Sequence, residues 1–310
     1  MPNPLMHEPN SLLVKEILQE KKRDRRWKNI RFMGWFVLFA YIAISIFSQF
    51  RQHSTVVVTP GKKYAALIRI NGMIAPGRDL SAEELVPVFQ EAFRDRHAEG
   101  IIIDINSPGG TPVQASIIHD AIIMFKKKYH KKVVVVGEDL LTSGAYFVAV
   151  AADKIYVNPS TLTGSIGVIM KGFGFVGIMK KVGIERRVYT AGNDKDRLDP
   201  FLPQSPEDVK KIQEVMNHVH QQFEEAVLQG RSGKLHADPQ TLFTGDFWSG
   251  ETAVQLGLVD GLGNLLDVME TEFKTTNYKE YGNATSLLKL LSDQFSSSFN
   301  NFFYQAALPR

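Results

Sequence analysis

The chain has 310 residues, and 44% of them are apolar, which is enough for one large hydrophobic core or two smaller ones. It contains no cysteine, so disulfide bonds, a catalytic thiol and zinc held by cysteine are excluded. The formal net charge of +3 comes largely from a cluster of Lys and Arg at 21–31, so the composition does not indicate a nucleic-acid partner.

The first predicted element is a membrane anchor. Residues 32–50 carry no charge and number 19, close to the roughly 20 that a transmembrane helix needs. A buried core helix or a cleaved signal peptide is the alternative, but the run is long for a signal peptide and no A-x-A site follows it. Basic residues cluster before the run, and only Arg51 follows it closely. The positive-inside rule then predicts a cytoplasmic segment at 1–31, a signal anchor at 32–50 in the cytoplasmic (inner) membrane, and an extracytoplasmic or periplasmic remainder.

After a predicted stalk at 51–62, short apolar strands alternate with helices. We expect strands over 64–74, 100–105, 132–138 and 154–158, and helices over 81–95, 112–129 and around 143–152. Ser81 with Glu84 three residues later is a capping-box pattern at the start of the first of these helices. Short all-apolar strands between helices are typical of an α/β protein with a parallel sheet and right-handed crossovers.

A second block of the chain is more helical. We expect a strand over 185–189, a long helix over 205–230 with Ser205 as its N-cap, and a short helix and turn over 249–264. One apolar stripe follows the long helix: Val209, Ile212, Met216, Val219 and Phe223. The folded domain is expected to cover 63–274. Residues 275–310, with Leu and Phe at helical spacing among Ser and Asn, are predicted to form an amphipathic or mobile tail.

Two motifs follow the ends of predicted strands. The stretch NSPGG at 106–110 follows the strand 100–105, and its glycines allow N–H groups to approach a ligand, as in an oxyanion hole; an ordinary turn is the alternative. Ser143, with Gly144 after it, holds the equivalent place one strand later, either as an open nucleophile or as a helix cap. If the two strands are neighbours, Ser143 and Gly110 emerge at one edge of the sheet.

A serine nucleophile needs a base. His218 and His220 lie two residues apart in the long helix, on different faces, and we interpret both as solvated or structural. Lys195 is the other candidate, because burial can depress the pKa of a lysine. In an extended segment Lys195 would face inward while its two flanking aspartates face water; a solvated charged loop is the alternative.

Four motifs, in order, carry a resemblance to a known family: INSPGG, TSGAYFVAVAADKIYVNPSTLTGSIGV, YTAGNDKDRLDP and SGETAVQLGLVDGLG. Over residues 64–273 the chain resembles the short form of signal peptide peptidase A, a family of membrane-anchored serine peptidases with a ClpP/crotonase-type fold. The resemblance implies a Ser-Lys dyad without metal or cofactor. The roles it implies are nucleophile for Ser143, general base for Lys195, positioning of that lysine for Ser165, and oxyanion donors for Gly110 and Gly144.

The resemblance also implies substrates and an assembly. The substrates would be cleaved signal peptides, bound extended beside the sheet. The assembly would be a ring-forming homo-oligomer in which the serine and the lysine of one site come from neighbouring subunits. Ala145, Thr111 and Pro112 depart from the family pattern at the edges of the site, where they would affect specificity more than activity. Two alternatives stay open: a crotonase-like acyl-CoA enzyme, and a non-catalytic membrane scaffold of the same fold.

Overall fold

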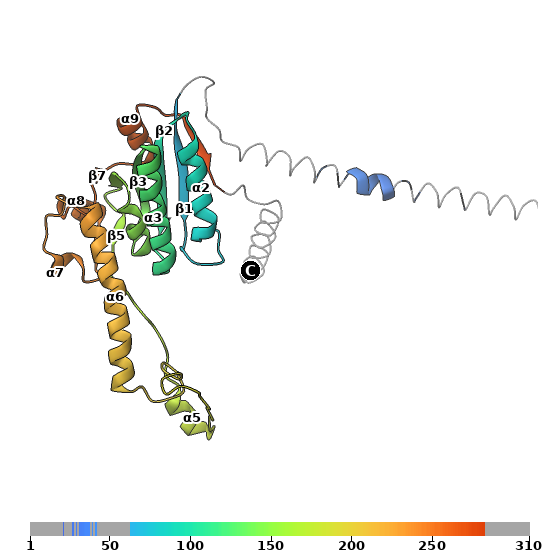
Figure 1. The fold of residues 1–310 in the computed structure, drawn as a ribbon. Helices are drawn as coiled ribbons and strands as arrows, with labels where there is room; N and C mark the ends of the chain where they lie inside the picture. The colour runs from blue at the N-terminus through green and yellow to red at the C-terminus, as the bar shows by residue number, and fades with distance from the viewer. Residues whose placement is uncertain are drawn as a thin grey trace, which may run out of the picture. The chain divides into compact units, whose positions relative to one another are not determined.

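The computed structural model describes residues 63–282 and, before them, Lys21, Trp27, Asn29, residues 31–37, Phe39 and Tyr41 (Figure 1). The chain divides into two units, 1–56 and 57–310. In the first unit the described residues are helical, and large apolar side chains such as Phe32 and Trp35 are exposed. Among the described residues, no helix combines the length and the apolar character that crossing a bilayer requires. The predicted anchor at 32–50 lies partly outside the described residues, and the predicted stalk lies wholly outside them.

The second unit is built on an eight-stranded sheet, which confirms the α/β prediction. The strands are β1 (Tyr64–Asn71), β2 (Ala98–Ser107), β3 (Lys132–Thr142), β4 (Lys154–Val157), β5 (Leu162–Gly164), β6 (Phe247–Ser249), β7 (Gly261–Leu262) and β8 (Tyr278–Tyr281). Their order is β6-β5-β3-β2-β1-β8, with β4 pairing with β3 and β7. The strands pair in parallel except for β5 and β6, which are antiparallel, so the sheet is mixed rather than wholly parallel.

Helices cover both faces of this sheet (Figure 1). The helices of this unit are α2 (Ala82–Arg94), α3 (Pro112–Tyr129), α4 (Gly144–Ala149), α5 (Val176–Val182), α6 (Pro206–Gly230), α7 (Pro239–Leu242), α8 (Gly250–Gln255) and α9 (Leu265–Phe273), of which α5 lies away from the sheet. The larger core lies between α2, α3 and α4 and one sheet face, where Phe89 and Ile122 are fully buried. A smaller core lies under α9, around Leu67 and Met269. The predicted caps are present: the hydroxyl of Ser81 accepts from the Glu84 N–H, as that of Ser205 does from the N–H three residues on.

Two expectations about the sheet were wrong. The strand expected over 185–189 is absent, because this described segment lies at the far end of α6, away from any sheet edge with which it could pair (Figure 1). The boundary expected at 274 cuts off β8, which pairs with β1. Two tyrosines, Tyr64 on β1 and Tyr281 on β8, donate to the carboxylate of Asp95 at the end of α2. The last strand is therefore tied to the domain by side chains as well as by its backbone.

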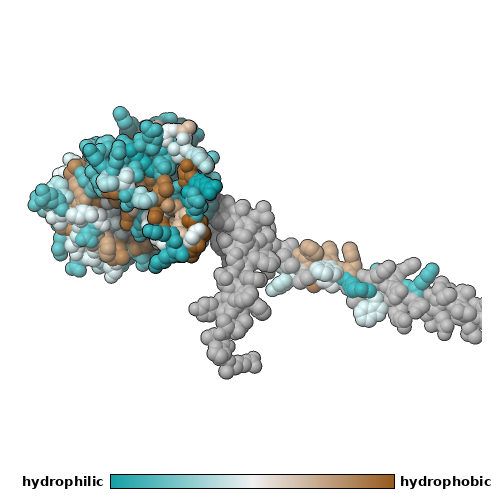
Figure 2. Space-filling model, turned by 90° about the horizontal axis from the view of Figure 1, so that it is seen from below, coloured by the Kyte–Doolittle hydropathy of each residue, from teal (hydrophilic) through white to brown (hydrophobic). Residues whose placement is uncertain are grey.

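The helix α6 connects the folded body to a projection that we call the arm, defined as residues 170–216 (Figure 1). Near its end α6 is packed into the body, with Phe223 and Val227 buried. Toward the start of α6 the predicted apolar stripe is no longer buried against the body, and Val209 is 47% exposed. Seen from the end at which α5 lies, the molecule shows apolar surface between polar patches (Figure 2). In the arm, Phe173 and Ile178 are among the exposed apolar side chains.

Candidate active site

Ser143 occupies a strained position between β3 and α4. Its φ and ψ of 52° and −127° are rarely adopted by a residue with a side chain, and such strain costs on the order of 1–3 kcal/mol. The backbone is held from both sides, because the Ser143 N–H donates to the Gly164 carbonyl at 2.8 Å and its carbonyl accepts from the Phe147 N–H at 2.9 Å. Within the described residues, its hydroxyl makes no capping hydrogen bond to α4. Ser143 therefore begins the helix without serving as its side-chain cap, and the hydroxyl is left for other contacts.

Two backbone amides lie beside this serine. Gly144 is the first residue of α4, so its N–H has no acceptor within the helix. Two hydrogen bonds hold the backbone on either side of Gly110. The Ile74 N–H donates to the Gly109 carbonyl, and the Thr111 N–H donates to the Ile74 carbonyl. Neither bond uses the Gly110 N–H. A methyl group added to Gly144 would lie 3.0 Å from the Gly110 nitrogen, so the two loops approach closely. A pair of oxyanion donors would need two amides this close to the serine.

Gly109 permits this close approach. Its φ of +100° is a conformation that side chains disfavour. A methyl group there would meet the Gly144 nitrogen at 2.7 Å and the Ser143 Cβ at 2.8 Å. The first glycine of the NSPGG motif therefore brings the loop against the serine, and the second supplies the amide.

Two cavities adjoin at Ser143. The apolar cavity has a volume of about 270 Å³, and its larger apolar lining side chains are Val113, Ile117, Phe147, Val168, Ile169, Val219 and Phe223. The polar cavity has a volume of about 410 Å³ and includes the polar side chains of Ser165, Gln213, Asn217, His220 and Thr244. A peptide carbonyl at Ser143 would thus have apolar surface on one side and hydrogen-bonding groups on the other.

A turn at Ser165 forms one wall of the polar cavity. Its φ of 51° is in the left-handed region, and the turn is fixed by a bond from the Ser165 N–H to the Asp246 carbonyl at 2.8 Å. The Ser165 hydroxyl donates to the Gly245 carbonyl at 3.4 Å. The Nε2 of His220 lies 3.1 Å from the Ile166 carbonyl, to which it must donate. Ser165 and Gly245 both line this cavity, and each carries an oxygen that can accept from an ammonium group.

His220 is a residue whose place at the site the sequence did not reveal. Its bond to the Ile166 carbonyl agrees with the structural role expected of it, yet its side chain also lines the cavity that reaches Ser143. His218 is exposed, as expected for a residue on a different face of the same helix. The only available signal was position on α6, and that becomes informative only once the packing of α6 against the Ser165 turn is known.

Lys195 lies outside both cavities as the described residues form them. It is exposed, in a loop of consecutive turns in the arm, so the segment is the solvated charged loop that the sequence allowed and not the extended alternative. The turns form because the Lys195 N–H donates to the Gly192 carbonyl at 3.3 Å and the Arg197 N–H to the Asp194 carbonyl at 3.4 Å. Within one chain the structure thus brings together Ser143 and the residues predicted to surround it, but not Lys195.

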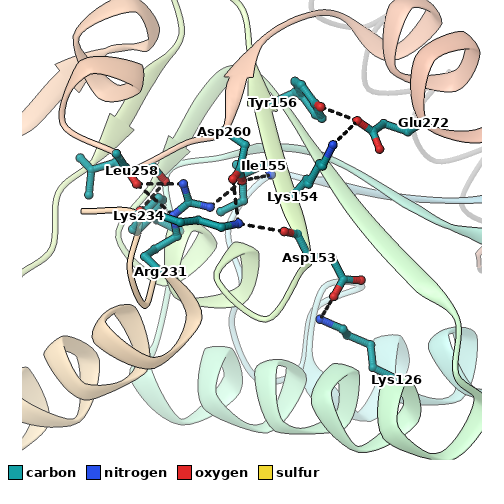
Figure 3. Close-up of polar contacts among 12 residues, drawn as sticks. Lys126, Asp153, Lys154, Ile155, Tyr156, Arg231, Lys234, Leu258, Asp260 and Glu272 are labelled. Atoms are coloured by element: carbon teal, nitrogen blue, oxygen red, sulfur yellow. Dashed lines mark hydrogen bonds and ion pairs between the residues drawn. The ribbon is translucent and has the colours of Figure 1, made fainter. Parts of the chain in front are cut away.

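An ionic network is centred on the buried Arg231 (Figure 3). Arg231, only 2% exposed, donates from Nε and Nη2 to the Gly257 carbonyl at 3.0 and 2.8 Å, and from Nη1 to Asp260. Burial alone would raise the pKa of Asp260, but hydrogen bonds from Arg231 and Lys234 hold that pKa below its ordinary value. Tyr146, on α4, donates to the carbonyl next to Gly257, that of residue 258, at 2.7 Å. Arg231 and Tyr146 therefore bind adjacent carbonyls, and Tyr146 ties α4 to the segment that carries Asp260.

Comparison of the sequence with known proteins identifies the family to which the chain belongs. The sequence pattern of peptidase family S49 matches residues 125–287, which is more than half of the chain. The chain belongs to peptidase family S49. The matched region contains Ser143, Ser165 and Lys195 and begins after Gly110. Membership supports a serine peptidase and bears out the resemblance to signal peptide peptidase A.

Relatives of this S49 chain differ in length and in name. It is 41% identical over 233 residues to a Brucella melitensis protein named Na(+)/H(+) antiporter NhaA, which covers 74% of the chain and 30% of that protein. An Enterococcus faecium protein with the provisional name signal peptide peptidase SppA is 32% identical over 197 residues, 62% of the chain and 57% of that protein. Serine protease SPPA of Arabidopsis thaliana, a chloroplastic protein, is 28% identical over 220 residues, 68% of the chain and 32% of that protein. The chain thus spans from about a third to somewhat over half of these relatives.

Proposed function

We propose that this chain is a membrane-bound serine endopeptidase with a Ser-Lys dyad. The observation that carries the proposal is the strained Ser143, with its hydroxyl uncommitted to α4 and two glycine amides beside it. Ser143 attacks the scissile carbonyl, and the N–H groups of Gly110 and Gly144 stabilise the oxyanion that forms. Lys195 in its neutral form accepts the serine proton and returns it to the leaving amine. Water then releases the acyl group from the serine.

The dyad is completed between subunits. Lys195 is exposed on the arm, at a distance from the serine of its own chain, while the polar cavity beside Ser143 presents the oxygens of Ser165 and Gly245. We infer that the arm of one subunit delivers Lys195 to the polar cavity of the next, in a ring-forming homo-oligomer. Entry into that cavity would place the Lys195 amine beside the Ser143 hydroxyl, from which a general base takes its proton.

The proposed substrates are cleaved signal peptides, bound in extended form. The apolar cavity beside Ser143 is suited to an apolar side chain next to the scissile bond, and signal peptides are rich in such side chains. The name of the Enterococcus faecium relative agrees with this substrate class. The charge distribution around 32–50 supports a location on the extracytoplasmic side of the cytoplasmic membrane, where signal peptides are released.

Mixing two inactive proteins tests this function. Ser143→Ala and Lys195→Ala should each reduce the rate of peptide cleavage more than about a thousandfold. After subunit exchange, the mixture should regain activity, because some interfaces pair an intact Ser143 with an intact Lys195. Exchange without recovery would refute the shared site. Lys195→Arg should also be inactive, since arginine stays protonated, and a fully active Lys195→Arg protein would remove the lysine from its role.

Labelling separates the remaining function classes. A fluorophosphonate should attach to Ser143 in the wild-type protein and not in Ser143→Ala. A crotonase-like acyl-CoA enzyme has no need of an activated Ser143, so absence of labelling would favour that class. Labelling without any peptide turnover would favour a scaffold.

A further inference from the structure

One arginine, which is bound by several carboxylates, holds the loop that carries Lys195. Arg197, two residues after Lys195, is half-buried, and its Nε donates to the Asp208 carboxylate at 2.8 Å. Its Nη2 lies 3.0 Å from an oxygen of Asp194 and 3.7 Å from one of Glu207. A single guanidinium group thus joins the residue before Lys195 to the first turn of α6.

The carboxylates on α6 are themselves well placed. Glu207 and Asp208 are in the first turn of the helix, where negative charge is favoured by the helix dipole. The Asp208 N–H donates to the hydroxyl of the N-cap Ser205 at 3.0 Å. The side chains of Arg197 and Asp208 are only 22% and 23% exposed, so water screens their attraction less than that of a surface pair. Arg197 is therefore bound to a carboxylate whose position is fixed by the first turn of α6.

A second pair holds the other end of the same loop. Asp199, whose side chain is 7% exposed, accepts from Arg186 at 2.6 Å and from the Phe201 N–H at 3.0 Å. The backbone on both sides of Lys195 is thus constrained, although the lysine side chain is exposed. This combination suits a side chain that must be presented outward in a defined position.

We propose that Arg197 is a positioning residue for the general base, holding the Lys195 loop in the conformation that enters the neighbouring subunit's polar cavity. This inference rests on the proposed function, because Arg197 has no base to position if Lys195 is not one. A misplacement of about 1 Å in a catalytic group can lower a rate about a hundredfold. We therefore expect Arg197→Ala to lower kcat between tenfold and a hundredfold, with KM changed less than twofold.

The test introduces Arg197→Ala into one partner of the complementing mixture. The Ser143→Ala subunit supplies the lysine, so Arg197→Ala in that subunit should lower the recovered activity at least tenfold. The Lys195→Ala subunit supplies the serine, so Arg197→Ala there should leave the recovered activity unchanged. A purely structural role for Arg197 in the assembly would reduce activity equally in both arrangements.

Two further variants sharpen the result. Arg187 lies in the same arm and pairs with Glu185, but their side chains are 71% and 73% exposed, so Arg187→Ala serves as the matched control and should change neither arrangement. Arg197→Lys in the Ser143→Ala subunit should restore part of the loss, because an ammonium can still reach one carboxylate.

The possible failures are distinguishable. Equal losses in the two arrangements, or no loss in either, would overturn the role of Arg197 and leave the dyad intact. A parent mixture that exchanges subunits but recovers no activity would overturn the shared site, and the role of Arg197 with it.

Discussion

The carboxylate of Glu272 provides the most quantitative prediction. Glu272 projects from α9 toward the sheet, where Lys132 of β3 and both Lys154 and Tyr156 of β4 donate to it (Figure 3). Burial alone would raise the pKa of Glu272, but hydrogen bonds from these three groups hold that pKa at about 2, below the ordinary 4.5. The carboxylate therefore joins α9 to two strands only while it is ionised.

The size of this contribution follows from the pKa. At 1.36 kcal/mol per pKa unit, the difference between 4.5 and about 2 corresponds to about 3 kcal/mol of folding free energy. The side chain is 7% exposed, so little of this is lost to screening by water. Because the folded-state pKa lies below the unfolded value, the stabilisation is complete above about pH 4.5 and is lost as the pH falls through about 2. Glu272→Gln should thus cost about 3 kcal/mol at pH 7 but only about 1 kcal/mol at pH 3.

Urea unfolding at these two pH values is the assay. The free energy of unfolding of the wild type, of Glu272→Gln and of a control is obtained at each pH from the transition midpoint and slope. Glu270→Gln, an exposed carboxylate on the same helix, is the matched control and should change stability by less than about 0.5 kcal/mol. A loss in Glu272→Gln of the same size at both pH values would show that the ionised form is not what stabilises α9.

Three other predictions concern the site, its support and the membrane. Gly109→Ala should lower kcat at least about a hundredfold in a peptide-cleavage assay, because its methyl group would lie 2.7 Å from the amide nitrogen that follows the nucleophile; near-normal kcat would contradict that geometry. Arg231→Met should lower the free energy of unfolding by about 3 kcal/mol in urea titration, since it removes both side-chain bonds to the Gly257 carbonyl and leaves Asp260 with only Lys234 and the Ile155 N–H; a loss below about 1 kcal/mol would show that the network is dispensable. Protease added outside the cytoplasm should cleave after Arg51 and spare 21–31, whereas the reverse pattern would invert the proposed topology.

Much of the fold follows from local signals in the sequence. The helix α3 begins at Pro112 and ends at Tyr129 as predicted, and the cap at Ser81 was visible as a pattern of residue types. The closeness of Ser143 and Gly110 could also be predicted, because parallel strands end at one edge of their sheet. Their neighbours in β2 and β3 are indeed paired in parallel. These features depend on residues near one another in the chain or on a general rule of sheet topology.

Other features depend on distant contacts and could not be predicted. β8 is a short, polar strand that exists because the edge of β1 is available to it. The segment 185–189 has the residues of a strand but no such edge. The turns around Lys195 depend on Asp208 of α6, whose carboxylate binds Arg197, two residues after the lysine. In each case the presence or absence of a partner outside the segment itself decides the conformation.

The pairing of β1 with β8 has a consequence for synthesis of the protein. β1 ends at residue 71 and β8 at residue 281, so the ribosome adds 281 − 71 = 210 residues after completing β1 before its second edge can be covered. At about 5–20 residues per second this takes roughly 10–40 s. An uncovered strand edge can pair with another nascent chain. During this time the edge of β1 that later pairs with β8 has no partner in its own chain and can form hydrogen bonds with other chains. A ribosome that stalls before residue 281 is added would leave this edge unpaired.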